Sequence, residues 1–192
     1  MKKIVTTLLI ATVMMAATAS AQTAEQYYRT GKDADDAKDY ATAFTNYQKA
    51  ADMGFAKAQY QLGRAYEKGY GVAKSDKTAV KYYQMAAEQG HAKAQYQLGR
   101  AYDKGDGVKE NDALAFEWYS KAAQQGTAKA QYQLGKCYLK GKGVAEDAVK
   151  AKDYFIKAVS NPDGGDKVMK DLKREASEGD SDAKKILNMV KK

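Results

Sequence analysis

The sequence predicts an all-α protein built from stacked helix-turn-helix repeats, and three observations support this prediction. First, one phrase occurs three times at a 36-residue interval, as AKAQYQLGRAYEKG (56–69), AKAQYQLGRAYDKG (92–105) and AKAQYQLGKCYLKG (128–141). Second, apolar residues recur within the phrase at helical spacing. Third, a G-x-G-V stretch ends each copy and turns the chain. Such a period is typical of arrays in which each unit buries its apolar face on its neighbours.

Each unit is predicted to contain two helices, here called helix A and helix B. In helix A, Leu62 marks the buried face, and Gly63 beside it lets a partner helix approach closely. Asp76 and Asp112 are predicted to cap the following helix B. Cys137, the only cysteine, stands where the other copies have alanine. This predicts a small buried side chain in preference to a reactive thiol, and it excludes an internal disulfide.

The repeated pattern is A-x-x-x-L-G-x-x-Y-x-x-G-x-G-V, followed by Ala, two aromatic residues and Ala-Ala-x-x-Gly. It closely resembles the Sel1-like repeat family, relatives of the tetratricopeptide repeat, over roughly residues 54–161. The resemblance implies a right-handed α-solenoid that works as a scaffold or adaptor, with a groove lined by the A helices. One secreted branch of the family has a pair of cysteines in each unit. This chain departs from that pattern, so the enzymatic activity suggested for that branch is not expected.

The N-terminus has the layout of a secretory signal peptide. Lys2 and Lys3 precede an apolar run from Ile4 to Ala17, and small residues follow. We expect cleavage after Ala21, export to the periplasm or beyond it, and no stable membrane insertion, because the run is too short to span a bilayer. The expected segments are a signal peptide (1–21), an N-terminal tetratricopeptide-like helix pair (22–53), three Sel1-like repeats (54–89, 90–125 and 126–161) and degenerate C-terminal cap helices (162–192).

The sequence offers no catalytic centre. His91 is the only histidine and sits at a predicted turn, so neither a metal site nor a Ser–His–acid triad is expected. The acidic cluster Asp33, Asp35, Asp36 and Asp39 leaves two interpretations, a calcium site or a solvated helix end, and the missing loop motif favours the second. We therefore expect no catalytic residue, no cofactor and no metal.

A strip of tyrosine and basic residues is the candidate partner-binding surface. With Leu62 at the centre of the buried face and a turn of about 100° per residue, Tyr60 and Arg64 fall on the opposite face. Both residue types are common at binding hot spots, and the positive charge favours an acidic partner. Alternatively, the rings pack between helices and the charges are only solvated. The candidate residues are Lys57, Tyr60 and Arg64 in the first copy, Lys93, Tyr96 and Arg100 in the second, and Lys129, Tyr132 and Lys136 in the third.

These features predict a non-catalytic, exported scaffold that binds a protein or peptide in the groove of the A helices. Two alternatives remain: a periplasmic regulator of a membrane sensor, and an envelope-acting hydrolase for which no acid or nucleophile can be named. The formal net charge of +8 also raises nucleic acid as a partner. It is not expected, because acidic residues are interspersed throughout and no recognised nucleic-acid-binding motif is present.

Overall fold

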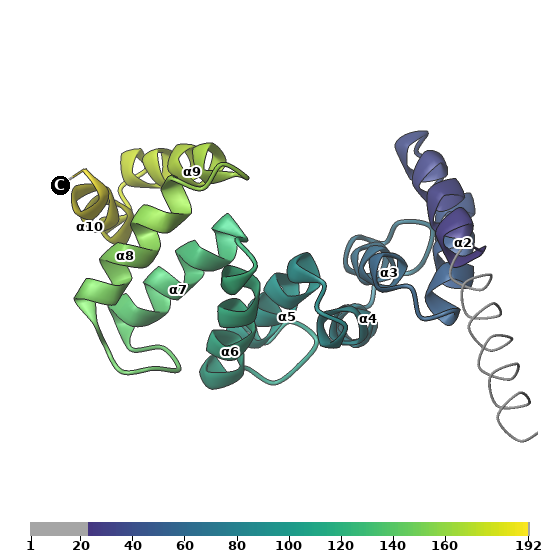
Figure 1. The fold of residues 1–192 in the computed structure, drawn as a ribbon, viewed down its shortest axis with the longest axis horizontal. Helices are drawn as coiled ribbons and strands as arrows, with labels where there is room; N and C mark the ends of the chain where they lie inside the picture. Colours follow the sequence, from purple (N-terminus) through teal and green to yellow (C-terminus); the bar gives the residue numbers. More distant parts are fainter. Residues whose placement is uncertain (1–22, 192) are drawn as a thin grey trace, which may run out of the picture. The chain divides into compact units, whose positions relative to one another are not determined.

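The computed structural model describes residues 23–191, which form helices joined by short turns and contain no strand (Figure 1). The all-α prediction is confirmed; the predicted signal peptide lies outside the described residues. The chain divides between Gln89 and Gly90 into two compact units, called here the N-terminal and C-terminal units. A first helix covers residues 23–36. It is followed by α2 (Tyr40–Asp52), α3 (Ala56–Lys68), α4 (Asp76–Glu88), α5 (Ala92–Lys104), α6 (Asp112–Gln124), α7 (Ala128–Lys140), α8 (Ala148–Val159), α9 (Gly165–Ser177) and α10 (Ser181–Val190).

The repeated helix pairs are α3 with α4, α5 with α6, and α7 with α8. In each pair the leucine of helix A is fully buried, and the glycine after it lies against an aromatic ring of helix B. A Cβ atom on Gly63 would lie 2.5 Å from the ring of Tyr83, and one on Gly135 would lie 2.5 Å from the ring of Phe155. The predicted close approach at Gly63 is therefore confirmed.

The two glycines of each G-x-G-V turn have different roles. The first ends helix A in a left-handed conformation, as Gly141 does with φ 67°. The second also has a positive φ, and in the first and third turns a Cβ atom there would collide with the backbone of the preceding helix pair. On Gly143 that atom would overlap the carbonyl of Asp112, and on Gly71 the carbonyl of Tyr40. Gly71 and Gly143 are thus contacts between neighbouring helix pairs.

The predicted caps of helix B are wrong by one residue. Ser75 and Asn111 each accept a hydrogen bond from the backbone N–H three residues later, at 3.2 and 3.0 Å. Asp76 and Asp112 are instead the first residues of α4 and α6. Their negative charges still interact favourably with the positive end of the helix dipole. Serine, asparagine and aspartate are all good cap residues. The backbone is extended at Ser75 and Asn111, so these residues are the caps. His91 is a cap too: its Nδ1 accepts from a backbone N–H of α5 at 3.2 Å.

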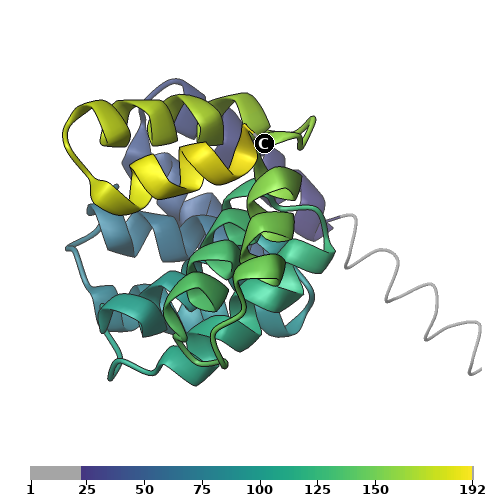
Figure 2. The same cartoon turned by 90° about the vertical axis from the view of Figure 1, so that its left-hand side faces the viewer.

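The C-terminal unit ends in the antiparallel pair α9 and α10, which lie side by side (Figure 2). Both helices pack on α8, and α9 also contacts α7. Leu172 of α9 and Ile186 of α10 are buried in one cluster with Phe155. This packing places the polar side of α9 beside helix A of the third repeat.

A buried amide links the two ends of each helix pair. Gln95 on α5 is 5% exposed, and its amide oxygen accepts from Gln125 Nε2 at 2.7 Å. The same nitrogen donates to the carbonyl of Gly90 at 3.0 Å. Asn161 makes the equivalent pair of bonds one repeat later. Neither helical periodicity nor motif spacing predicts this pairing.

Removing this amide should weaken folding. Gln125→Ala leaves the oxygens of Gln95 and Gly90 without this donor, so we expect a loss of about 1–2 kcal/mol in the free energy of unfolding. Gln124→Ala, at the exposed neighbouring position, should change it by less than about 0.5 kcal/mol. Urea unfolding followed by circular dichroism measures both. Equal losses in the two variants would show that the amide link has no such role.

The prediction that Cys137 is a small buried residue is confirmed, because its side chain is 5% exposed in the core of α6 and α7. Burial, with a smaller contribution from the charge of Asp103, raises the pKa of the Cys137 thiol to about 12 from an ordinary value of 9.0. The folded protein therefore keeps this proton at pH values where the unfolded chain releases it.

The raised thiol pKa predicts a pH-dependent stability. The contribution of the protonated thiol to the free energy of unfolding is complete below pH 9. It falls between pH 9 and about 12, by up to about 1.4 kcal/mol per pH unit. Cys137→Ala, which copies the alanine of the other repeats, removes this component. The free energy of unfolding of the wild type should therefore fall relative to that of the variant as the pH rises above 9. A difference that stays constant across this range would contradict the assignment.

Candidate partner-binding surface

The structure places the nine predicted residues on α3, α5 and α7, at matching positions of each helix. In each helix the spacing is i, i+3 and i+7, which aligns the three side chains on one face. The lysines of the first turn are exposed, whereas the tyrosines and the last basic residues are half-buried. The first set is Lys57, Tyr60 and Arg64, the second is Lys93, Tyr96 and Arg100, and the third is Lys129, Tyr132 and Lys136.

Each of these tyrosine rings packs on one side against the aromatic residue of helix B in its own repeat. The centroid distances are 5.9 Å for Tyr60, 5.9 Å for Tyr96 and 5.6 Å for Tyr132. Burial is the largest influence on all three phenols and raises the pKa of each. Packing thus accounts for part of the burial of each ring, and binding at these tyrosines stays a prediction.

The basic residues at the end of each set are held along their own helices. Arg64 donates to the side-chain oxygen of Gln61 at 3.1 Å, and Arg100 donates to that of Gln97 at 2.9 Å. The ammonium of Lys136 lies 5.9 Å from the ring centroid of Tyr132. Since these partners leave donors unused on both guanidinium groups, the cations remain available to an acceptor.

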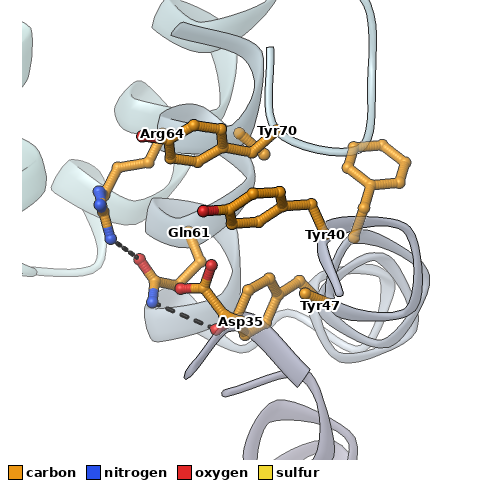
Figure 3. Close-up of a pocket in the computed structure, with 9 residues that line it drawn as sticks. Asp35, Tyr40, Tyr47, Gln61, Arg64 and Tyr70 are labelled. Carbon is orange, nitrogen blue, oxygen red and sulfur yellow. Dashed lines mark hydrogen bonds between the residues drawn. The ribbon is translucent and has the colours of Figure 1, made fainter. Parts of the chain in front are cut away.

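In the N-terminal unit, Arg64 lies at a small, shallow hollow between α2 and α3 (Figure 3). Gln61 links it to the core by donating to the Tyr47 hydroxyl at 3.3 Å. Tyr40 and Tyr70 stack in parallel beside it, with ring centroids 4.5 Å apart and an interplanar angle of 10°. The hollow therefore combines one guanidinium with flat aromatic walls.

The acidic cluster is divided among structural roles. Asp35 lines this hollow, Asp36 pairs with Lys32 at 3.0 Å, and Asp39 caps α2. Among residues 23–191, no group of three or more His, Cys, Asp or Glu side chains is arranged to hold a metal ion. Within the same part of the chain, no helix is long and apolar enough to cross a membrane.

In the C-terminal unit, three predicted residues meet at a larger hollow, called here the C-terminal groove. Tyr96 of α5 and Gln133 of α7 both line it, so the two A helices meet at this point. Helix α9 closes the opposite side with two carboxylates. The groove is lined by Tyr96, Lys129, Tyr132, Gln133, Val168, Asp171, Leu172 and Glu175.

The carboxylates of the groove are not among the residues predicted from the sequence, where residues 162–192 are expected to be only a cap. A signal is present, because Asp171 and Glu175 lie four residues apart, beside the apolar positions Val168 and Leu172 of the same helix. That spacing places both carboxylates next to the buried face. Only the packing of α9 on α7 shows that they face Tyr132.

Comparisons with known proteins agree with this architecture. A family model described as Sel1 repeat matches residues 17–55, 56–91, 92–127 and 128–163. The crystal structure of a Sel1 repeat protein from Oxalobacter formigenes is similar, with 31% identity over 81% of this chain and 72% of that one, and a TM-score of 0.68. The protective antigen c5321 of uropathogenic Escherichia coli, which displays an SLR fold, has 29% identity and a TM-score of 0.65. It is matched over 91% of this chain but only 38% of its own length. A comparison with curated proteins gave no match.

Proposed function

This chain belongs to the Sel1-repeat family, and on that premise we propose that it is a non-catalytic, exported scaffold that binds a protein or peptide partner across its A helices. The observation that carries the proposal is the recurrence of one Lys–Tyr–Arg/Lys set along one face of α3, α5 and α7, with the lysine exposed and the other two residues half-buried. In each set the tyrosine ring is held in place by its contact with an aromatic ring of helix B. Anchored aromatic residues give contact area at little entropic cost, which suits a binding surface.

The titratable groups support a non-catalytic protein. A general acid needs a raised carboxyl pKa, whereas three carboxyl groups of residues 23–191 have lowered pKa values. Hydrogen bonds lower the pKa of Asp39 and Asp147, and the Lys140 ammonium lowers that of Asp182. Cys137 is buried and protonated, which makes it a poor nucleophile.

Affinity capture with paired baits tests the proposal. The wild-type protein and the variant Arg64→Glu/Arg100→Glu/Lys136→Glu are each used to capture partners from envelope extract. A control variant, Lys77→Glu/Lys81→Glu/Lys109→Glu, makes the same charge change at exposed positions outside the A helices.

We expect one protein to be captured by the wild type and the control and to be lost with the A-helix variant. Circular dichroism should show that all three baits are equally folded. A partner captured equally by all three baits would contradict the proposed surface.

Export is tested separately by fractionating cells that express the full chain. The expected result is a protein outside the cytoplasm whose N-terminal residue is Gln22. A full-length protein that stays in the cytoplasm would contradict export. The binding proposal would then be decided by the capture experiment alone.

A further inference from the structure

We propose that the C-terminal groove binds the cationic side chain of an arginine or lysine in a partner peptide, between its tyrosine rings and its two carboxylates. This inference builds on the proposed scaffold function and specifies the partner's chemistry at one place. It differs from the acidic partner that the basic residues of the A helices favour.

The walls of the groove suit a long side chain that ends in a cation. Tyr96 and Tyr132 supply aromatic surface on one side, and Leu172 of α9 supplies an apolar base. A lysine or arginine stem packs on such surface while its charged end stays near polar groups. The faces of aromatic rings attract a cation within about 6 Å.

The carboxylates of Asp171 and Glu175 supply the charge. Both are half-buried, and neither forms an ion pair or a hydrogen bond with another of residues 23–191. They differ in this from nearby Asp182, which pairs with Lys140, and from Asp180, which caps α10. A forked guanidinium group can form two parallel hydrogen bonds with a carboxylate, so these two groups suit an arginine side chain.

The electrostatic environment of Tyr132 points the same way. After burial, the next influences that raise the pKa of this phenol are the negative charges of Glu175, Asp180 and Asp182. The groove is therefore negative beside Tyr132, although Lys129 lies on its α7 wall. No ion pair within 4.0 Å joins Lys129 to either groove carboxylate among the described residues, so the carboxylates remain available to an incoming cation.

A peptide titration followed by amide NMR tests the inference. The probe is the acetylated, amidated tripeptide Gly-Arg-Gly, and its matched control is the same peptide with citrulline, which keeps the shape and removes the charge. We expect the arginine peptide to shift amides of α7 and α9 with a saturable, millimolar-range response. The citrulline peptide should bind at least tenfold more weakly.

Two variants locate the effect. Asp171→Asn/Glu175→Gln should weaken binding of the arginine peptide at least tenfold, whereas Asp153→Asn/Asp166→Asn, at exposed positions of α8 and α9, should leave it unchanged. Equal binding of the two peptides, no saturable shift, or no effect of the groove variant would overturn the inference. Because the peptides are defined, any of these results leaves the capture experiment free to decide the scaffold function.

Discussion

Gly143→Ala is expected to destabilise the C-terminal unit by about 3 kcal/mol or more. Two costs add at this position. The backbone has φ 69°, where a side chain costs about 1–2 kcal/mol. The new Cβ atom would also overlap the carbonyl of Asp112 in the preceding helix pair. Backbone cannot move aside as a flexible side chain can, so the repeats must separate, and such overpacking typically costs about 1–3 kcal/mol.

Gly126→Ala separates these two costs. Gly126 has φ 80°, but nothing lies within 4 Å of the Cβ atom that alanine would add. This variant should therefore lose only the backbone component, about 1–2 kcal/mol. Urea unfolding of both variants gives the comparison. If Gly143→Ala costs no more than Gly126→Ala, the second glycine of the G-x-G-V turn is not a contact between repeats.

Phe155→Ala is the second large effect, with an expected loss of about 3–5 kcal/mol in the free energy of unfolding. Phe155 is fully buried, and its ring lies against Gly135 and the ring of Tyr132. It also belongs to the cluster that holds α9 and α10 on α8. Removing the ring opens a cavity, and Gly135 has no side chain that could move into it.

The neighbouring variant Ile156→Ala provides the control, because Ile156 is 38% exposed. It should cost less than about 1 kcal/mol. Amide NMR of Phe155→Ala should in addition show shifts around Tyr132 and in α9, since both rest on the deleted ring. A loss below about 1.5 kcal/mol, or shifts confined to α8, would contradict this account of the C-terminal core.

Local sequence signals were enough to predict the helix pairs. The buried leucine, the glycine beside it and the aromatic residues of helix B all follow from helical periodicity. The 36-residue interval set the register, and the resemblance to a known repeat family added the solenoid architecture. The cap at Ser75 was missed because Ser75 and Asp76 are both good cap residues, so composition alone does not say at which of the two the backbone becomes helical.

The groove was harder to predict, because it depends on contacts between distant segments. Tyr60, Tyr96 and Tyr132 look alike in the sequence, yet only Tyr96 and Tyr132 line the C-terminal groove. The difference comes from α9, whose packing on α7 brings Asp171 and Glu175 to Tyr132. That helix lies outside the three clear repeats, so no repeat pattern describes it.

The most direct test of the central claim, that partners bind to the A helices, is site-specific photo-crosslinking in cells that express the protein. A benzophenone amino acid replaces Lys57, Lys93 or Lys129 on α3, α5 and α7, and in a matched set it replaces an exposed residue on each helix B. The account predicts the same crosslinked partner from A-helix positions and none from the matched set. A partner crosslinked only from the B-helix positions would contradict it. The B-helix positions are Lys77, Glu117 and Asp153.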